Sequence, residues 1–436
     1  MEKSIFKSYT KYVSLNILGM IGLSCYILAD TYYIAKALGA TGIAALNFSI
    51  PIYSLIHGLG LMIGIGGATK YTILKSQMKD KTANIVFSHS IGLGALIGVI
   101  LAIIGILGST SLAYTLGADP STLPLTKTYL TTILCFAPFF IINNIMLAFV
   151  RNDHNPNLSM QAMLAGSFSN IVLDYAFMFP LHMGMFGAAF ATGFAPIISL
   201  GVLSIHFTQK KNRIQMIRCR IQGSFLRDIF GLGLSALISE VSNAVVLITF
   251  NLVILQLEGN IGVASYGIIA NIALVGISVF TGIAQGIQPL ISKGYGRKNN
   301  EVLKKVLRYA ILTSIMIAVI TYILTYLNSD LMIALFNSDK NAEIGQLAKN
   351  GLRIYFMGFL FAGFNIIIAM YLSATEQATN AFIISILRGC IIIVPMVLLF
   401  SQLWKMTGVW FSFVLTEGIV TMIAFYIMGR RKINNE

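Results

Sequence analysis

Residues 170–192 read NIVLDYAFMFPLHMGMFGAAFAT, two apolar runs that flank a turn and carry an amide, a carboxylate and a hydroxyl. Asn170 and Asp174 are four positions apart, so on a helix they share one face. Residues 180–187 reverse the chain, and at roughly 1.5 Å per residue Asp174 lies about 9 Å and Thr192 about 8 Å from that turn. The pattern predicts a helical hairpin on which Asn170, Asp174 and Thr192 meet and outline a cation site.

The two acidic residues Asp30 and Asp174 are expected at the same depth of a membrane. A charged side chain there costs roughly 2.5 to 3.5 kcal/mol on insertion scales, so an intramembrane Asp marks a candidate functional site. A structural interpretation stays open: Asp174 could be a protonated hydrogen-bonding residue between packed helices, with Asn170 and Thr192 as ordinary polar contacts.

The composition is that of a membrane protein. Of 436 residues, 56% are hydrophobic and only 11% are charged, whereas about 25% are charged in soluble proteins. Segments of about 20 apolar residues can cross a bilayer as helices. The sequence therefore predicts an all-α polytopic membrane protein with twelve transmembrane helices, near residues 12–35, 43–69, 84–107, 126–150, 159–181, 186–208, 228–257, 262–291, 306–328, 348–373, 380–402 and 407–428.

The net charge of +14 follows the predicted topology. Lys and Arg gather before the first helix, after the second and eighth, between the halves and at the C-terminus, while the alternate loops are poor in them. The positive-inside rule then places both termini in the cytoplasm, and no nucleic-acid partner is expected. The four cysteines form no CxxC pair, so neither a disulfide framework nor a bound metal cofactor is predicted.

The chain contains an internal repeat. GATGIAAL at residues 39–46 falls on GNIGVASY at 259–266, and NIMLAFV at 144–150 falls on NIIIAMY at 365–371. Six helices per half return the chain to its starting side, so the repeat is parallel, as in transporters whose substrate path runs between two bundles. We expect pseudo-symmetric lobes at residues 1–209 and 223–436, joined by a basic linker at 210–222. Because one chain supplies both lobes, a monomer is expected.

The halves differ in their polar residues. Asp30, Asp174 and Thr192 align with Phe250, Pro395 and Phe413, so the cation site belongs to the first lobe. In the second lobe Arg388 and Glu417 are expected to form a structural ion pair. Glu240 is a candidate for contact with a cationic substrate, and His57 is either a packing residue or a proton relay.

Four segments carry a resemblance to a known family: DTYYIAKALGATGIAALNFSIPI from Asp30, VRNDHNPNLSMQAM from Val150, NIVLDYAFMF with GAAFAT from Asn170, and QPLISKGYGRKN from Gln288. The chain resembles the bacterial branch of the multidrug and toxic compound extrusion (MATE) family along essentially its whole length. The resemblance implies a multi-pass protein of the bacterial inner membrane that exports amphipathic or cationic organic compounds in exchange for Na⁺ or H⁺, and that is not an enzyme.

The resemblance also implies roles for particular residues. Asp30, Asn170, Asp174 and Thr192 match the family's first-lobe cation site, and Glu240 matches an acidic residue used in one branch. The chain departs from the family in two places: the first helix lacks a proline that some members carry, and the tenth helix offers Asn365 where others carry an Asp. Both departures favour coupling at the first-lobe site.

Sodium is the expected coupling ion, because two carboxylates, an amide and a hydroxyl are hard oxygen ligands, although a proton needs only one carboxylate. Soft aromatic and thioether side chains adapt to substrates of varied shape. The candidate substrate-contacting residues are Tyr33, Phe136, Phe139, Met146, Phe177 and Met178. The alternative within transport is a flippase for lipid-linked precursors, which would need a strongly cationic cavity. A membrane-embedded enzyme would need a DxxxD, HExxH or Ser/Lys site, and the sequence holds none. A receptor would give no reason for Asp30 and Asp174 to share a depth.

Overall fold

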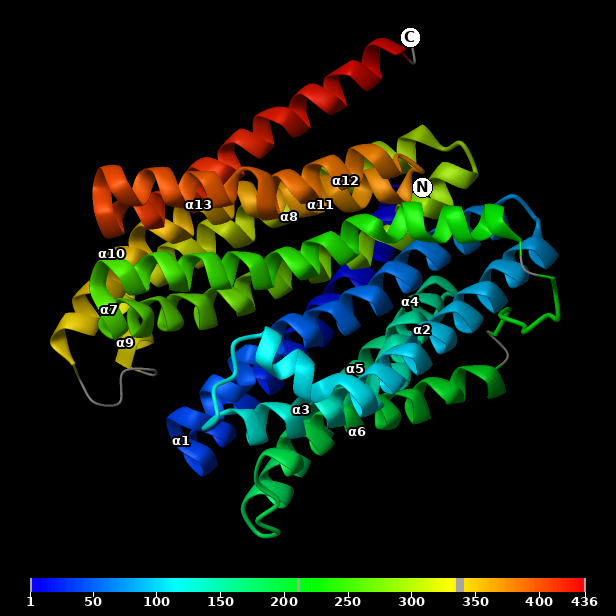
Figure 1. Cartoon of the computed structure of the whole chain (residues 1–436). Coiled ribbons are helices and arrows are strands. Elements are labelled where there is room, and N and C mark those ends of the chain that lie inside the picture. The colour runs from blue at the N-terminus through cyan, green and yellow to red at the C-terminus, as the bar shows by residue number, and fades with distance from the viewer. Residues whose placement is uncertain (1, 210–211, 221, 335–340, 435–436) are drawn as a thin grey trace.

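The computed structural model describes residues 2–209, 212–220, 222–334 and 341–434 (Figure 1). Residues 210, 211 and 221 of the predicted linker lie outside the described residues. The described residues form helices and no strand. The helices are α1 (Glu2–Ser76), α2 (Asp80–Thr115), α3 (Leu123–Cys135), α4 (Ala137–Asn152), α5 (Pro156–Met178), α6 (Gly184–Ser204), η1 (Ile205–Thr208), α7 (Gly223–Gly296), α8 (Asn300–Leu327), α9 (Ser329–Ala334), α10 (Ala342–Tyr355), η2 (Phe356–Gly358), α11 (Phe359–Ala374), α12 (Ala378–Ile386), η3 (Leu387–Ile391) and α13 (Ile393–Asn434).

The longest helices are pairs of arms. α1 breaks at Gly39 (φ 62°, ψ −152°), and α7 breaks at Gly259 (φ 59°, ψ −150°), in a region of backbone space that only glycine enters freely. α13 breaks at Trp404 and Lys405. In the described chain seven helices are long and apolar enough to cross a membrane, or eight if α3 and α4, bent by 49°, form one span. With the broken helices counted as separate arms, and with α5, the expected twelve segments are all present.

The predicted repeat is confirmed by the backbone. Gly39 and Gly259, which the sequence alignment pairs, break their helices with nearly the same dihedral angles. The turn that follows the broken helix also contains a residue in the left-handed region in each lobe: Met78 (φ 62°) after α1 and Lys298 (φ 54°) after α7. Such residues end helices by turning the chain out of the helical path. Each lobe therefore repeats the same sequence of helices and stops.

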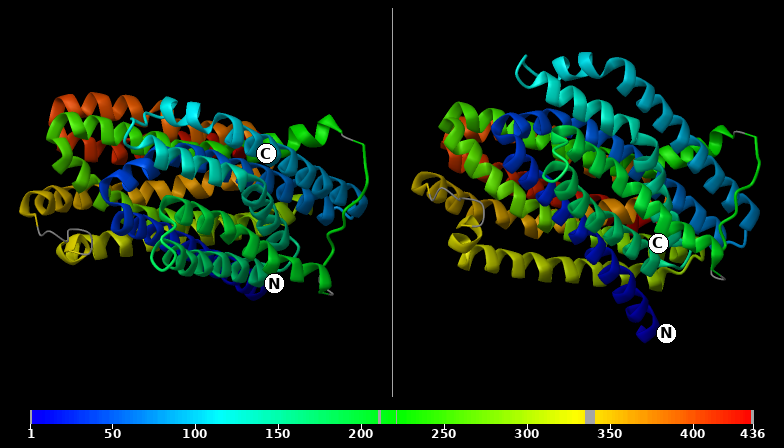
Figure 2. Two further views of the ribbon diagram at one scale, coloured as in Figure 1. Left: turned by 60° about the horizontal axis from the view of Figure 1, so that its bottom comes forward. Right: turned by 90° about the horizontal axis from the view of Figure 1, so that it is seen from below.

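Each lobe has its own apolar core. One cluster of buried side chains runs from Met20 to Ile229, and the other consists mainly of residues 250–413. The linker lies at one end of the molecule, where α1 begins and α13 ends (Figure 1), and the turned views place it at the same end (Figure 2). We call this the basic end. The shared end of the first and last helices agrees with an even number of membrane crossings.

Polar contacts join the lobes from the middle of the molecule to the basic end. Ser24 donates to Ser278 at 2.7 Å, between Oγ atoms. Nearer the basic end Nδ2 of Asn152 donates to Oε1 of Gln288 at 2.7 Å, and Lys70 Nζ lies 3.0 Å from Asp228 and 2.7 Å from Glu376. The first lobe is thus held to the second where the basic loops are, which closes this end of the molecule.

Backbone contact tightens the same closure. The second arm of α1 packs on the first arm of α7 so closely that a Cβ on Gly233 would overlap the carbonyl oxygen of Met62. A Cβ on Gly66 would overlap the carbonyl oxygen of Ile229 in the same way. Only glycine allows this approach of helix backbones, as in other small-residue helix contacts in membranes.

Gly233→Ala should destabilise the protein by about 1 to 3 kcal/mol, because the methyl group forces the two helices apart. Gly231→Ala is the matched control: it lies on the same helix, and its Cβ would meet Ala378 at 3.8 Å, an ordinary contact. Thermal unfolding of the purified variants in detergent measures the difference. Equal midpoints for the two variants would contradict the tight packing inferred at Gly233.

Candidate cation site and central cavity

The hairpin of α5 and α6 forms as the sequence predicts. Asn155 caps α5, its Oδ1 accepting from the Leu158 backbone N–H at 3.4 Å, and Pro156 follows at the first helical turn. The chain then turns through His182 (φ 51°) and Gly184 (φ 56°) into α6. Asn170, Asp174 and Thr192 are consequently brought to neighbouring positions on two antiparallel helices.

The three side chains of the hairpin are buried and in contact. Asn170 and Asp174 are fully buried, and Thr192 is 3% exposed. Asn170 lies 3.3 Å from the Thr192 hydroxyl. When the oxygen and nitrogen of the Asn170 amide are exchanged, the amide satisfies both neighbours. It then donates to Asp174 Oδ2 at 3.0 Å and accepts from the Thr192 backbone N–H at 3.2 Å. In this orientation the amide links the Asp174 carboxylate to the backbone of Thr192.

Asp30 completes the cluster from α1. Its side chain is 6% exposed, and its carboxyl group interacts electrostatically with that of Asp174. In each of these residues Oδ1 is buried and has no hydrogen-bond partner in the described part of the chain. Tyr129 of α3 borders the cluster and is hydrogen-bonded to Thr192. Each of the two carboxyl groups thus keeps one buried oxygen without a hydrogen-bond donor among the described residues.

This donor set suits a cation. Carboxylate, amide and hydroxyl oxygens are the ligands that hard alkali and alkaline-earth ions take. Two neighbouring carboxylates repel each other, so a cation or a proton stabilises the pair in a medium of low dielectric constant. The open oxygens of Asp30 and Asp174 can take either.

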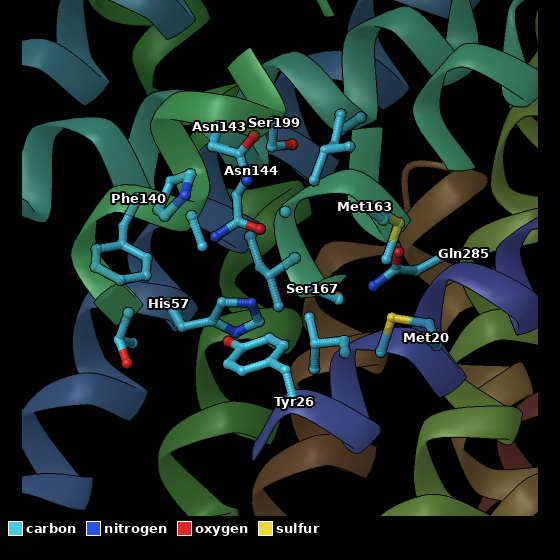
Figure 3. A pocket seen from close by; sticks show the side chains of 18 of the residues that line it. Met20, Tyr26, His57, Phe140, Asn143, Asn144, Met163, Ser167, Ser199 and Gln285 are labelled. Atoms are coloured by element: carbon cyan, nitrogen blue, oxygen red, sulfur yellow. The ribbon is translucent and has the colours of Figure 1, made fainter. Parts of the chain in front are cut away.

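A cavity adjoins the cluster at Thr192 and extends between α1, α4, α5, α6 and α7. Tyr26, Tyr53 and His57 line one part of it, and Met20, Met163 and Gln285 lie close to one another in the view of Figure 3. The hydroxyls of Tyr26 and Tyr53 are 2.6 Å apart, and the Tyr53 and His57 rings stack with centroids 6.1 Å apart. The cavity therefore has apolar, aromatic and thioether walls with a few polar groups, the usual form of a small-molecule site.

The structure does not bring the six predicted aromatic and thioether residues to this cavity. Its lining comprises Met20, Leu23, Tyr26, Tyr53, His57, Leu61, Phe140, Asn143, Asn144, Leu147, Ala148, Arg151, Met163, Gly166, Ser167, Thr192, Ala195, Pro196, Ser199 and Gln285. Elsewhere, Tyr33 packs on Tyr175 and Phe179, and Phe136 and Phe177 pack on Phe190.

The other three candidates are also away from the cavity lining. Met146 and Met178 are buried in the first-lobe core, and Phe139 is 42% exposed. The physical reason is periodicity: a helix that is apolar on all sides does not indicate which of its faces borders the cavity. Substrate contact by these six residues remains a prediction.

The acidic residues of the second lobe are placed as follows. The ion pair predicted for Arg388 and Glu417 is confirmed, with Nη2 2.6 Å and Nε 3.1 Å from Oε1. Asn365 donates to Oε2 of the same carboxylate at 2.7 Å. Glu240 has a partner that the sequence did not indicate, because its Oε2 lies 3.6 Å from Nδ1 of His57 in the opposite lobe.

Several cavity residues were not singled out in the sequence. Tyr26 lies one helical turn before Asp30, a spacing that places both on one face and could have indicated its position. Asn143 and Arg151 on α4 lie two helical turns apart, eight positions, on one face of an otherwise apolar segment. That polar face was the available signal for this wall of the cavity.

Comparison with known proteins agrees with this architecture. The chain is 28% identical over 429 residues to the multidrug export protein MepA of Staphylococcus saprophyticus, covering 98% of this chain and 94% of that protein. It is 27% identical over 430 residues to the protein of the same name from Staphylococcus aureus, with the same coverage.

A solved structure, the outward-facing conformation of a multidrug resistance MATE family transporter of the MOP superfamily, matches with a TM-score of 0.92 at 25% identity. The match covers 98% of this chain and 96% of that one. The MatE family model matches residues 16–176 and 236–399, one segment in each lobe. The chain therefore belongs to the MatE family.

Proposed function

We propose that this protein is a secondary antiporter that exports amphipathic, mainly cationic organic compounds across the plasma membrane in exchange for a cation. The observation that carries the proposal is the pair of buried carboxyl groups, Asp30 and Asp174, whose Oδ1 atoms have no partner and which adjoin a cavity through Thr192. The names of the staphylococcal relatives support drug export as the process.

The exchange follows from the electrostatics of the acidic cluster. A lobe movement that closes two bare carboxylates away from water is heavily penalised, whereas either a coupling ion or an organic cation removes that penalty. The site is therefore occupied by a cation in each direction of the lobe movement, by the organic compound in one and by the coupling ion in the other. With the basic end in the cytoplasm, as the positive-inside rule favours, a membrane potential of 100 mV drives inward ion movement by about 2.3 kcal/mol per charge.

Sodium is the coupling ion we favour. Asp30, Asp174, Asn170 and Thr192 offer more oxygen ligands than a proton needs, and their arrangement on three helix segments suits an ion that requires several ligands at once. A proton would require only one of the two carboxyl groups, and the amide and hydroxyl would then serve to orient it.

The deciding experiment uses the full chain in proteoliposomes loaded with a cationic dye. Gradients of Na⁺ and of pH are imposed separately, with the membrane potential clamped by potassium and valinomycin. We expect a sodium gradient alone to drive dye transport. Transport driven by the pH gradient alone would assign the coupling to protons, and no dye movement under either gradient would refute the antiporter.

Glu240→Gln should weaken the export of dicationic compounds more than that of monocations. The Glu240 carboxylate is 26% exposed and lies 3.6 Å from His57 beside the cavity, so it can pair with a second positive charge of a substrate. Loss of a partly exposed charge contact of roughly 1 kcal/mol corresponds to about a fivefold rise in apparent KM for the dication. Efflux assays with a matched mono- and dicationic pair measure it, and equal effects on both would contradict this role.

A further inference from the structure

The linker between the lobes is fastened to the first lobe along α2. We call its described residues, 212–220 and Gln222, the strap; it lies at the basic end between α6 and α7 (Figure 1). Four of its backbone N–H groups donate to side chains of the first lobe: Arg213 to Asp153 Oδ2 at 2.7 Å, Gln215 to Asn84 Oδ1 at 3.3 Å, Ile217 to Ser88 Oγ at 2.8 Å and Gln222 to His89 Nε2 at 3.0 Å. The strap therefore has a fixed position on this lobe.

Two further contacts hold the beginning of the strap. Ile214 is 1% exposed and belongs to the apolar core of the first lobe. Lys75 Nζ donates to the backbone carbonyl of Arg213 at 3.0 Å. A segment without helix or strand must satisfy its backbone polar groups in another way, and here side chains of the first lobe serve that purpose.

The lipid-facing surface of α2 gives the depth of the strap in a membrane. The large exposed apolar side chains of α2 begin at Leu96 and end at Tyr114, a length of roughly 27 Å that is close to the hydrocarbon core of about 30 Å. Ser88 and His89 precede Leu96 by roughly 10 to 12 Å along the helix, and the headgroup layer is about 5 to 8 Å thick on each side. The strap therefore borders the headgroup layer.

The strap carries positive charge at this depth. Arg218 and Arg220 lie between the contacts with Ser88 and His89, and both side chains are exposed. Neither arginine forms an ion pair within the described part of the chain. Lys81 of α2 is also exposed and lies seven positions before Ser88, on the same face of the helix. Together these side chains form a cationic surface beside the lipid.

The charges of the linker have no acidic residues among them. Between residues 210 and 220 the sequence contains Lys210, Lys211, Arg213, Arg218 and Arg220, and no Asp or Glu. A positive-inside bias alone requires only that basic residues stay on one side of the membrane, which a loose loop also satisfies. In this protein α2 uses three polar side chains to hold the backbone of the strap, so the two arginines are also held at a defined depth.

We propose that the strap binds the head groups of anionic phospholipids in the leaflet at the basic end, through Arg218 and Arg220 with Lys81 at its edge. The planar guanidinium group pairs with phosphate oxygens through parallel N–H donors. Met216, which is 68% exposed, adds an apolar side chain to the same segment. The proposal concerns the membrane surface of the first lobe, so it does not depend on what the protein transports.

The test measures the local preference for an anionic lipid by tryptophan quenching. Met216→Trp places a fluorophore on the strap of the full chain, and the signal of the parent chain, from Trp404 and Trp410 of α13, is subtracted. The protein is reconstituted in dioleoylphosphatidylcholine vesicles that contain increasing amounts of brominated phosphatidylglycerol, or of brominated phosphatidylcholine as the reference. We expect phosphatidylglycerol to bind beside the strap about 5- to 30-fold more tightly than phosphatidylcholine, since each basic residue near an anionic headgroup contributes a factor of about five.

Three double variants in the Met216→Trp chain locate the effect. Arg218→Gln with Arg220→Gln should remove most of the preference, and the fold should persist because both side chains are exposed and unpaired among the described residues. Lys304→Gln with Arg308→Gln is the matched control: it removes two exposed charges from the same end, on α8, and should keep most of the preference. Asn84→Ala with Ser88→Ala retains every charge but removes two acceptors of the strap, and it should lower the preference.

Several results would overturn the proposal. One is a Met216→Trp chain with equal affinity for the two lipids, a result that needs no further variant. Another is an equal loss in the α8 control and in the arginine variant, which would assign the effect to overall surface charge. An unchanged preference in the Asn84 and Ser88 variant would show that the arginines act without a fixed strap. Loss of the preference in millimolar inorganic phosphate at constant ionic strength would assign the site to free anions rather than to lipid.

Discussion

Asp174→Asn should abolish ion-driven transport while leaving the protein folded. The substitution keeps the shape of the side chain and removes the charge for which, in the proposed antiporter, the coupling ion and the organic cation compete. Asp174 is fully buried, and its Oδ1 has no hydrogen-bond partner among the residues that the structure describes, so its charge is available to a ligand. We expect affinity for the coupling ion to fall about 10- to 100-fold, as for other lost contacts to a charged group.

The measurement is dye flux in proteoliposomes under a sodium gradient, compared with the flux without a gradient. Asp330→Asn is the matched control, because that carboxylate is 79% exposed and forms a surface pair with Lys349 at 2.8 Å. Surface pairs contribute about 0 to 1 kcal/mol, so the control should transport normally. An Asp174→Asn protein that exports at the wild-type rate would assign the cluster a purely structural role.

Glu417→Gln should be the most destabilising single change considered for the second lobe. Oε1 of Glu417 accepts from Nη2 of Arg388 at 2.6 Å, and the carboxylate is only 2% exposed. Removing one partner of a buried pair leaves the other charge uncompensated, which costs about 3 to 5 kcal/mol. The midpoint of thermal unfolding in detergent should therefore fall well below that of the wild type.

Glu301→Gln provides the control for charge loss at the surface. Glu301 pairs with Lys305 at 2.7 Å one turn along α8, in a side chain that is 51% exposed, and such pairs contribute about 0.3 to 0.5 kcal/mol. The double replacement Arg388→Met with Glu417→Leu should recover much of the lost stability, because it removes both charges together. A single Glu417→Gln variant as stable as Glu301→Gln would show that the pair contributes little.

The fold was largely predictable because its determinants repeat along the chain. Apolar length gives the membrane segments, and the match of Gly39 to Gly259 gives the repeat that the backbone breaks later confirm. The cluster of Asn170, Asp174 and Thr192 was also predictable, because helical spacing and a single turn fix which side chains can meet. Each of these inferences depends on local sequence alone.

The cavity was not predictable in the same way. Its walls come from helix segments that are far apart in the chain and apolar on several faces, so periodicity does not identify the face of α4 that carries Phe140 and Arg151. The pairing of His57 with Glu240 likewise depends on how the lobes pack, which leaves no signal in either segment. Contacts between lobes require the tertiary structure.

The glycine contacts between α1 and α7 have an electrical consequence. Where the backbones touch at Gly66 and Gly233, no water molecule fits between the two helices. A dry contact conducts far less than a hydrated cavity, so in the proposed antiporter we expect part of the membrane voltage to fall across this contact. A charge carried past this contact by the proposed lobe movement would cross that part of the field, so we expect the lobe movement, rather than diffusion within the cavity, to depend on voltage.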